Sequence, residues 1–142
     1  MTKPSMLFDT TEHVLIAVHG REPPSDEEWE SYMQAAGSLP PTCTKTLVVT
    51  AGGGPNAKQR ASINDYVSKT ALTVAICTDA LLVRQIGTAL SWFNPRVKAF
   101  RGSDVVAALR YLEITGPEAA EVQHKVTKMR LEIEGRPSRA PR

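Results

Sequence analysis

The stretch "KTLVVTAGGGPNAKQRASINDYVSKT", residues 45–70, passes from a strand pattern through three glycines into a helix pattern. Apolar residues follow one another without a break at 47–49, which is typical of a strand covered on both faces. After the glycines, a weaker apolar stripe at helical spacing comprises Ala61, Ile63, Tyr66 and Val67. The stretch therefore predicts one strand–helix unit of an α/β domain.

The same alternation extends to both sides of this unit. Strand patterns occupy 6–10, 13–20, 71–78 and 96–100, and helix patterns occupy 25–37, 79–93 and 103–114. The short gap between the first two strands predicts an antiparallel hairpin at the edge of an otherwise parallel sheet. We therefore predict an α/β domain over residues 1–115, with a single-layer mixed sheet of four to five strands joined by helices.

The helix expected at 25–37 has a clear start signal. Ser25 is a candidate N-cap, and Glu28 fits as its capping-box partner three residues later. Its apolar residues then recur at i, i+3, i+4 and i+7 and predict one buried face, made by Trp29, Tyr32, Met33 and Ala36.

Composition limits the possible functions. The net charge is only +2 and the basic residues are scattered, so no nucleic-acid surface is expected. No apolar run approaches the roughly 18 residues that a membrane-spanning helix needs. Residues 1–10 contain no apolar core of a signal peptide, and we expect a cytoplasmic protein. Cys43 and Cys77 lie far apart without metal-ligand spacing, so neither a metal, a cofactor nor a disulfide framework is predicted.

Catalytic groups do not cluster in the sequence. His13, His19 and His124 lie apart, and Ser62 lacks the G-x-S-x-G pattern of hydrolases. His19 could serve as a general base because it ends a strand beside a loop, but a solvated or capping histidine is the preferred interpretation. We therefore predict that the protein is not an enzyme.

The glycine-rich loop at 50–60 could bind a phosphate group. A Walker loop ends in G-K-[ST], whereas Lys58 stands between an alanine and a glutamine, and the dinucleotide pattern G-x-G-x-x-G lacks its third glycine. The preferred interpretation is a turn into the next helix, with Gly54 as N-cap and Pro55 in the first turn. The alternative is an anion or ligand site at this helix N-terminus, formed by Gly52, Gly53, Gly54, Lys58 and Arg60.

A last helix is expected at 118–134, within a C-terminal amphipathic segment at 116–135. Its apolar residues are spaced by three, four, three and four positions, as in a coiled-coil seam, and are Ala119, Val122, Val126, Met129 and Ile133. Such a seam suits docking of the helix onto its own domain. The alternative is that Val122, Val126, Met129 and Ile133 contact a second copy of the chain or a partner protein. The remaining run "RPSRAPR", 136–142, is expected to be disordered.

The stretch "VAICTDALLVRQIGTALSWFNPRVKAFRGSDVVAALRYL", 74–112, resembles the SpoIIAA-like branch of the STAS-like fold. The resemblance lies in the order of the elements, in a strand ending at Phe100, and in a closing helix that reads A-x-x-[WY]-L at 108–112. With the opening hairpin it extends over about 6–112. It implies a mixed sheet of four or five strands with helices mainly on one side, and regulatory contacts with other proteins.

Related anti-sigma-factor antagonists carry an Asp-Ser pair, with a phosphorylated serine, at the start of the second helix. This chain has "GGGPNAKQR" at that place, and the first serine after this loop is Ser62. The resemblance therefore implies a non-enzymatic protein-interaction module that lacks the phosphorylatable serine.

Overall fold

The computed structural model describes residues 4–68, 70, 72–79, 96–102 and 104–134. All but the first residue of the helix expected at 79–93, and the whole tail at 136–142, lie outside the described residues. The strands are β1 (Met6–Thr10), β2 (Val14–His19), β3 (Lys45–Thr50), β4 (Thr73–Thr78) and β5 (Val97–Phe100). The helices are α1 (Asp26–Gly37), α2 (Ala57–Ser68), α4 (Val105–Tyr111) and α5 (Gly116–Glu134).

The five strands form one mixed sheet in the order β1-β2-β3-β4-β5. β1 pairs antiparallel with β2, so that Met6 lies opposite His19, and the remaining neighbours are parallel. The predicted α/β class, the single mixed sheet and its antiparallel edge hairpin are confirmed.

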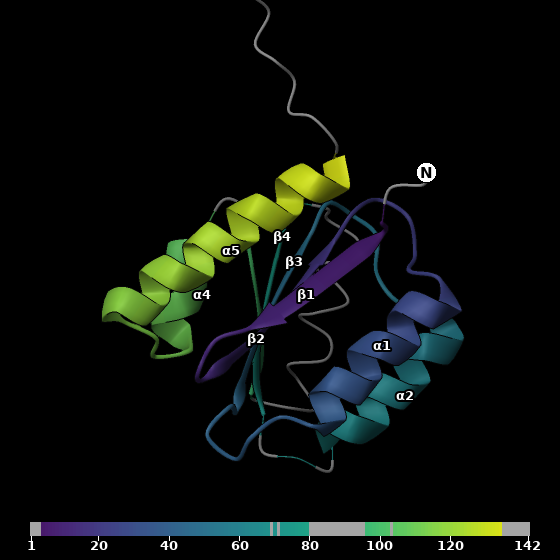
Figure 1. Ribbon diagram of the computed structural model, residues 1–142, viewed down its shortest axis with the longest axis horizontal. Helices are drawn as coiled ribbons and strands as arrows, with labels where there is room; N and C mark the ends of the chain where they lie inside the picture. The colour runs from purple at the N-terminus through teal and green to yellow at the C-terminus, as the bar shows by residue number, and fades with distance from the viewer. Residues whose placement is uncertain (1–3, 69, 71, 80–95, 103, 135–142) are drawn as a thin grey trace, which may run out of the picture.

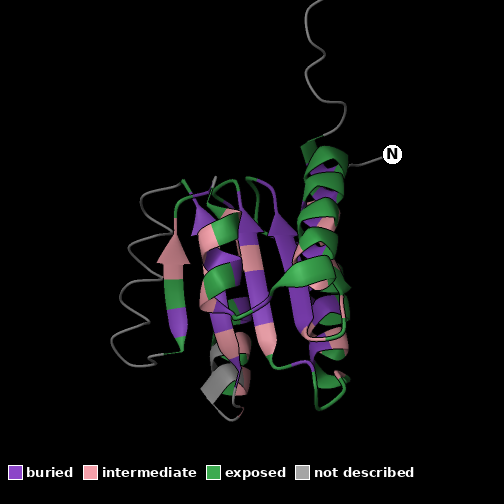
Figure 2. Cartoon of the chain, turned by 90° about the vertical axis from the view of Figure 1, so that its left-hand side faces the viewer, coloured by how far each residue is buried: buried purple, intermediate pink, exposed green. Residues whose placement is uncertain are grey.

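All six residues of β2 are buried, which means that both faces of this strand are covered (Figure 2). Successive side chains of a strand point to opposite faces. Val14, Ile16 and Val18 accordingly belong to one apolar cluster, and Leu15 and Ala17 belong to another.

Helices cover both faces of the sheet. Figure 1 shows α1 and α2 together on one face and α4 and α5 together on the other. The expectation that helices lie mainly on one side is therefore wrong. Helices lie on both sides because the face of β2 that carries Val14, Ile16 and Val18 is apolar and needs a cover, which α4 and α5 supply.

The start of α1 is as predicted. The Ser25 side chain accepts a hydrogen bond from the Glu28 amide at 3.0 Å, and a Glu28 carboxylate oxygen accepts one from the Ser25 amide at 2.8 Å. The buried residues of the helix are Trp29, Tyr32 and Ala36, while Met33 packs half-buried against the same cluster.

α5 is an integral part of the core. Its apolar seam packs against the sheet in the same cluster as β2, β3 and α4. Near its end, Ile133 fits so closely against Gly20 that a Cβ atom on the glycine would lie 2.8 Å from the isoleucine Cγ2. Residues 116–134 therefore share one core with the predicted domain over 1–115. Within the described ranges, no helix is long and apolar enough to cross a membrane.

Candidate functional site

Three buried polar residues end adjacent parallel strands at the carboxyl edge of the sheet, where α/β domains usually bind ligands. Thr50 pairs with His19 of β2 on one side and with Thr78 of β4 on the other. All three are buried. His19 lies two residues after Ala17 and four after Leu15, so its side chain is on the same face of the sheet as theirs, the face covered by α1 and α2.

The glycine loop folds back onto this row. The Gly52 amide donates to the Thr50 hydroxyl at 3.0 Å, and that hydroxyl donates to the Gly53 carbonyl. The Gly53 amide in turn donates to the Gly20 carbonyl at 2.8 Å. A Cβ atom at residue 53 would lie 2.6 Å from the Glu22 carbonyl oxygen and 2.7 Å from that of Gly20. Gly53 is therefore required for the close approach of two loops.

The N-cap of α2 differs from the prediction. Asn56 occupies the capping position instead of Gly54, because the Asn56 carbonyl accepts from the Arg60 amide at 2.8 Å. Pro55 precedes the helix, which begins at Ala57, and does not lie in its first turn. The Asn56 side chain accepts from the Gln59 amide, and the Gln59 side chain accepts from the Asn56 amide, both at 2.9 Å. This reciprocal pair satisfies two amides that an anion would otherwise find at a helix start.

The predicted anion site is thus only partly assembled. The amides of Gly52 and Gly53 already have partners within the chain. Lys58 and Arg60 are exposed on the first turn of α2, where an Arg60 guanidinium nitrogen donates to the Pro55 carbonyl at 3.1 Å. A Cβ atom on Gly54 would have no described atom within 4 Å. The loop's ability to bind a ligand stays a prediction.

His19 is buried, contrary to the preferred interpretation of a solvated or capping residue. Only 5% of its surface is exposed, and its Nδ1 atom has no hydrogen-bond partner among the residues that the structure describes. Burial lowers the pKa of this imidazole to about 4, against the opposing charge of Glu28. The side chain is therefore neutral at pH 7. A buried ring nitrogen without a partner is costly unless a water molecule or ligand satisfies it.

The four residues predicted to contact a partner are all buried within the chain. Val122, Val126, Met129 and Ile133 lie in the core cluster, so the self-docking alternative describes α5. The seam offers no exposed surface to a second copy in this arrangement. Binding of a partner protein or of a second copy stays a prediction.

Several residues of this edge were not singled out from the sequence. Thr50 organises the glycine loop, and Gln59 bridges the starts of α1 and α2 by donating to the Pro24 carbonyl at 3.1 Å and to Asp26 Oδ1 at 3.3 Å. The Asn-x-x-Gln spacing at 56–59 was a usable signal, since it is a capping-box pattern. The contacts of Thr50 and Gly53 depend on the tertiary fold and have no such signal.

Comparison of the chain with protein-family models, with curated proteins and with solved structures gave no match. The fold and this edge therefore have to be interpreted from their own geometry.

Replacing Gly53 by alanine tests whether the loop is closed as described. We expect Gly53→Ala to lower the free energy of unfolding by about 1–3 kcal/mol, because the new methyl group meets backbone atoms that cannot move independently. Gly54→Ala is the matched control and should change it by less than about 1 kcal/mol, since nothing lies within 4 Å. Urea titrations measure both, and equal effects of the two substitutions would show that the loop is open.

The burial of His19 predicts a specific loss of stability in acid. The folded-state pKa is depressed from 6.5 to about 4, so between these values the unfolded chain binds a proton that the folded chain does not. Stability therefore falls as the pH falls through this window, by up to about 3 kcal/mol. We expect His19→Phe to remove this part of the pH dependence. Parallel stability curves for variant and wild type, in urea titrations from pH 7 to 4, would contradict it.

Proposed function

We propose that the protein is a non-enzymatic regulatory module of STAS-like type that acts by binding another protein. The observation that carries the proposal is that the polar groups at the carboxyl edge serve the fold. The Thr50 hydroxyl, the amides of Gly52 and Gly53, and the side chains of Asn56 and Gln59 are all hydrogen-bonded within the chain. Because these polar groups already bind one another, we expect the partner protein to bind at another surface of the molecule.

The position of Ser62 supports a module without the phosphoserine switch. Ser62 lies inside α2, one turn and a half beyond its start. Its hydroxyl donates to the Gln59 carbonyl at 2.9 Å and accepts from the Trp29 indole nitrogen at 3.3 Å. The hydroxyl thus ties α2 to α1, and a phosphate group on it would break that contact.

The outer surface of α4 and α5 is the candidate partner surface. Val106 on α4 is 52% exposed and Leu131 on α5 is 41% exposed. Both helices belong to the same layer of the molecule (Figure 1). Val106 and Leu131 are the two large apolar side chains that the described residues expose, and a partner protein could cover them.

Affinity capture with surface variants tests this proposal. A tagged full-length chain should retain a specific protein from extract of its native host, and Val106→Glu and Leu131→Glu should each reduce the recovery several-fold. Gln123→Glu, an exposed change on α5, is the matched control and should leave the recovery unchanged. Unchanged recovery of the captured protein with both Val106→Glu and Leu131→Glu would contradict the proposed surface.

A second candidate function is the binding of a small polar molecule or anion at the carboxyl edge. It is favoured by the Nδ1 atom of His19, which finds no partner within the described ranges, and by the exposed Lys58 on the first turn of α2. Inorganic phosphate, nucleotides and phosphorylated metabolites can be tested by thermal shift, since a ligand that binds the folded state raises Tm. A shift that disappears in His19→Phe or Lys58→Ala would support this function, and a flat response across the panel would exclude these ligands.

A further inference from the structure

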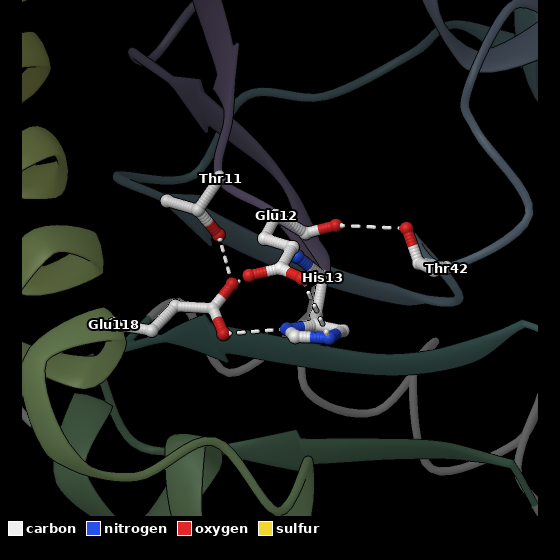
Figure 3. A network of polar contacts seen from close by, with 5 residues as sticks. All are labelled: Thr11, Glu12, His13, Thr42 and Glu118. Atoms are coloured by element: carbon white, nitrogen blue, oxygen red, sulfur yellow. Dashed lines mark hydrogen bonds and ion pairs between the residues drawn. The ribbon is translucent and has the colours of Figure 1, made fainter.

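One carboxylate fastens the first turn of α5 to the turn between β1 and β2. A Glu118 oxygen, Oε2, accepts from the Thr11 hydroxyl and from the His13 amide, each at 2.7 Å. The other oxygen, Oε1, lies 2.7 Å from Nδ1 of the His13 ring. Figure 3 shows Thr11 and His13 converging on the Glu118 carboxylate from the hairpin side. Three contacts therefore connect segments that lie about a hundred positions apart in the chain.

His13 can exchange its proton with solvent, because 42% of its side chain is exposed. The hydrogen bond to Glu118 raises its pKa above 6.5, and the Glu12 charge acts in the same direction. Lys45 of β3 opposes this effect. Further charged or titratable groups lie near this contact. Glu12 Oε2 is 3.7 Å from His13 Nε2, and Lys45 Nζ is 3.8 Å from Glu113 Oε1. Burial and the Glu118 charge raise the pKa of the Cys43 thiol.

The pKa of Glu118 is shifted in the opposite direction to that of His13. Its partial burial disfavours the charged form, but the hydrogen bonds from Thr11 and His13 outweigh burial and lower its pKa below 4.5. The pair is therefore charged on both sides at mildly acidic pH.

A second anchor of α5 does not titrate near neutrality. The Lys125 ammonium group lies 3.1 Å from Asp9 Oδ2 and donates to the Thr10 carbonyl at 3.0 Å. Burial lowers its pKa, but the carboxylates of Asp9 and Glu121 outweigh burial and raise it above 10.5. The lysine thus stays charged while His13 changes its charge.

We propose that His13 and Glu118 form a proton-sensitive clasp that holds the first turn of α5 on the hairpin at mildly acidic pH and loosens it as the pH rises past neutrality. The contribution of His13 is complete below 6.5 and is lost as the pH rises through the higher folded-state pKa. The contribution of Glu118 is present above 4.5 and is lost as the pH falls through the lower folded-state pKa. The clasp is therefore strongest between these two values. This inference concerns the conformation of α5 and does not rest on the proposed function.

Amide hydrogen exchange of the full chain, followed by NMR, tests the clasp. The opening equilibrium of α5 is obtained from the amides at 122–126 after correction for the intrinsic rate, and the amides of β3 report global unfolding. From about pH 5.5 to about pH 8, we expect the opening of α5 relative to β3 to increase roughly twofold to fivefold, the range for a partly exposed ion pair.

Three variants distinguish the clasp from a general pH effect. His13→Asn keeps a side-chain N–H group but does not titrate, and Glu118→Gln keeps an acceptor without charge, so each should abolish the increase. Lys125→Gln should raise the opening at both pH values and keep the ratio between them. An opening of α5 relative to β3 that is equal at both pH values in the wild type would overturn the proposal. The full increase in His13→Asn or in Glu118→Gln would overturn it as well.

Discussion

The complete burial of β2 is the constraint on which the rest of the structure depends. A strand whose six residues are all buried needs an apolar cover on each face of the sheet. α1 and α2 cover the Leu15 and Ala17 face, and α4 and α5 cover the opposite one. Each of the four seam residues of α5 gains about 1.5–3 kcal/mol on leaving water. α5 is for this reason part of the core and not an appendage to a finished domain.

The two ends of the parallel strands are used in different ways. At the carboxyl end, the Thr50 hydroxyl and the amides of Gly52 and Gly53 close the glycine loop, and no described residue gives the buried Nδ1 atom of His19 a hydrogen bond. At the other end, Glu118 binds the turn between β1 and β2 and fixes where α5 begins. The edge at which α/β domains usually bind ligands is thus occupied by structural hydrogen bonds, while a titrating contact is placed on a terminal helix.

Local features could be predicted from the sequence, and long-range ones could not. The strands, the hairpin and the Ser25 cap each depend on a few neighbouring residues. Periodicity shows that α5 has an apolar seam, but it does not say which face of the sheet the seam covers. The expectation of helices mainly on one side came from the family resemblance alone. The backbone that Gly53 approaches lies some thirty residues earlier in the chain, so no local pattern in the sequence indicates this contact. Gly53 was therefore interpreted as part of a possible phosphate loop. The alternation in "HVLIAVH" already placed His19 in register with the buried Leu15 and Ala17, and this signal predicts its burial better than its place at a strand end.

The central claim is that the seam of α5 covers the sheet of its own chain. Isotope-filtered NOE spectroscopy on a sample that mixes uniformly ¹³C-labelled and unlabelled chains tests it most directly. The account predicts NOEs from the Ile133 methyl groups to the Hα protons of Gly20 within the labelled chain, since these residues touch. NOEs that appear only between labelled and unlabelled chains would show that α5 covers a second copy and would contradict the account.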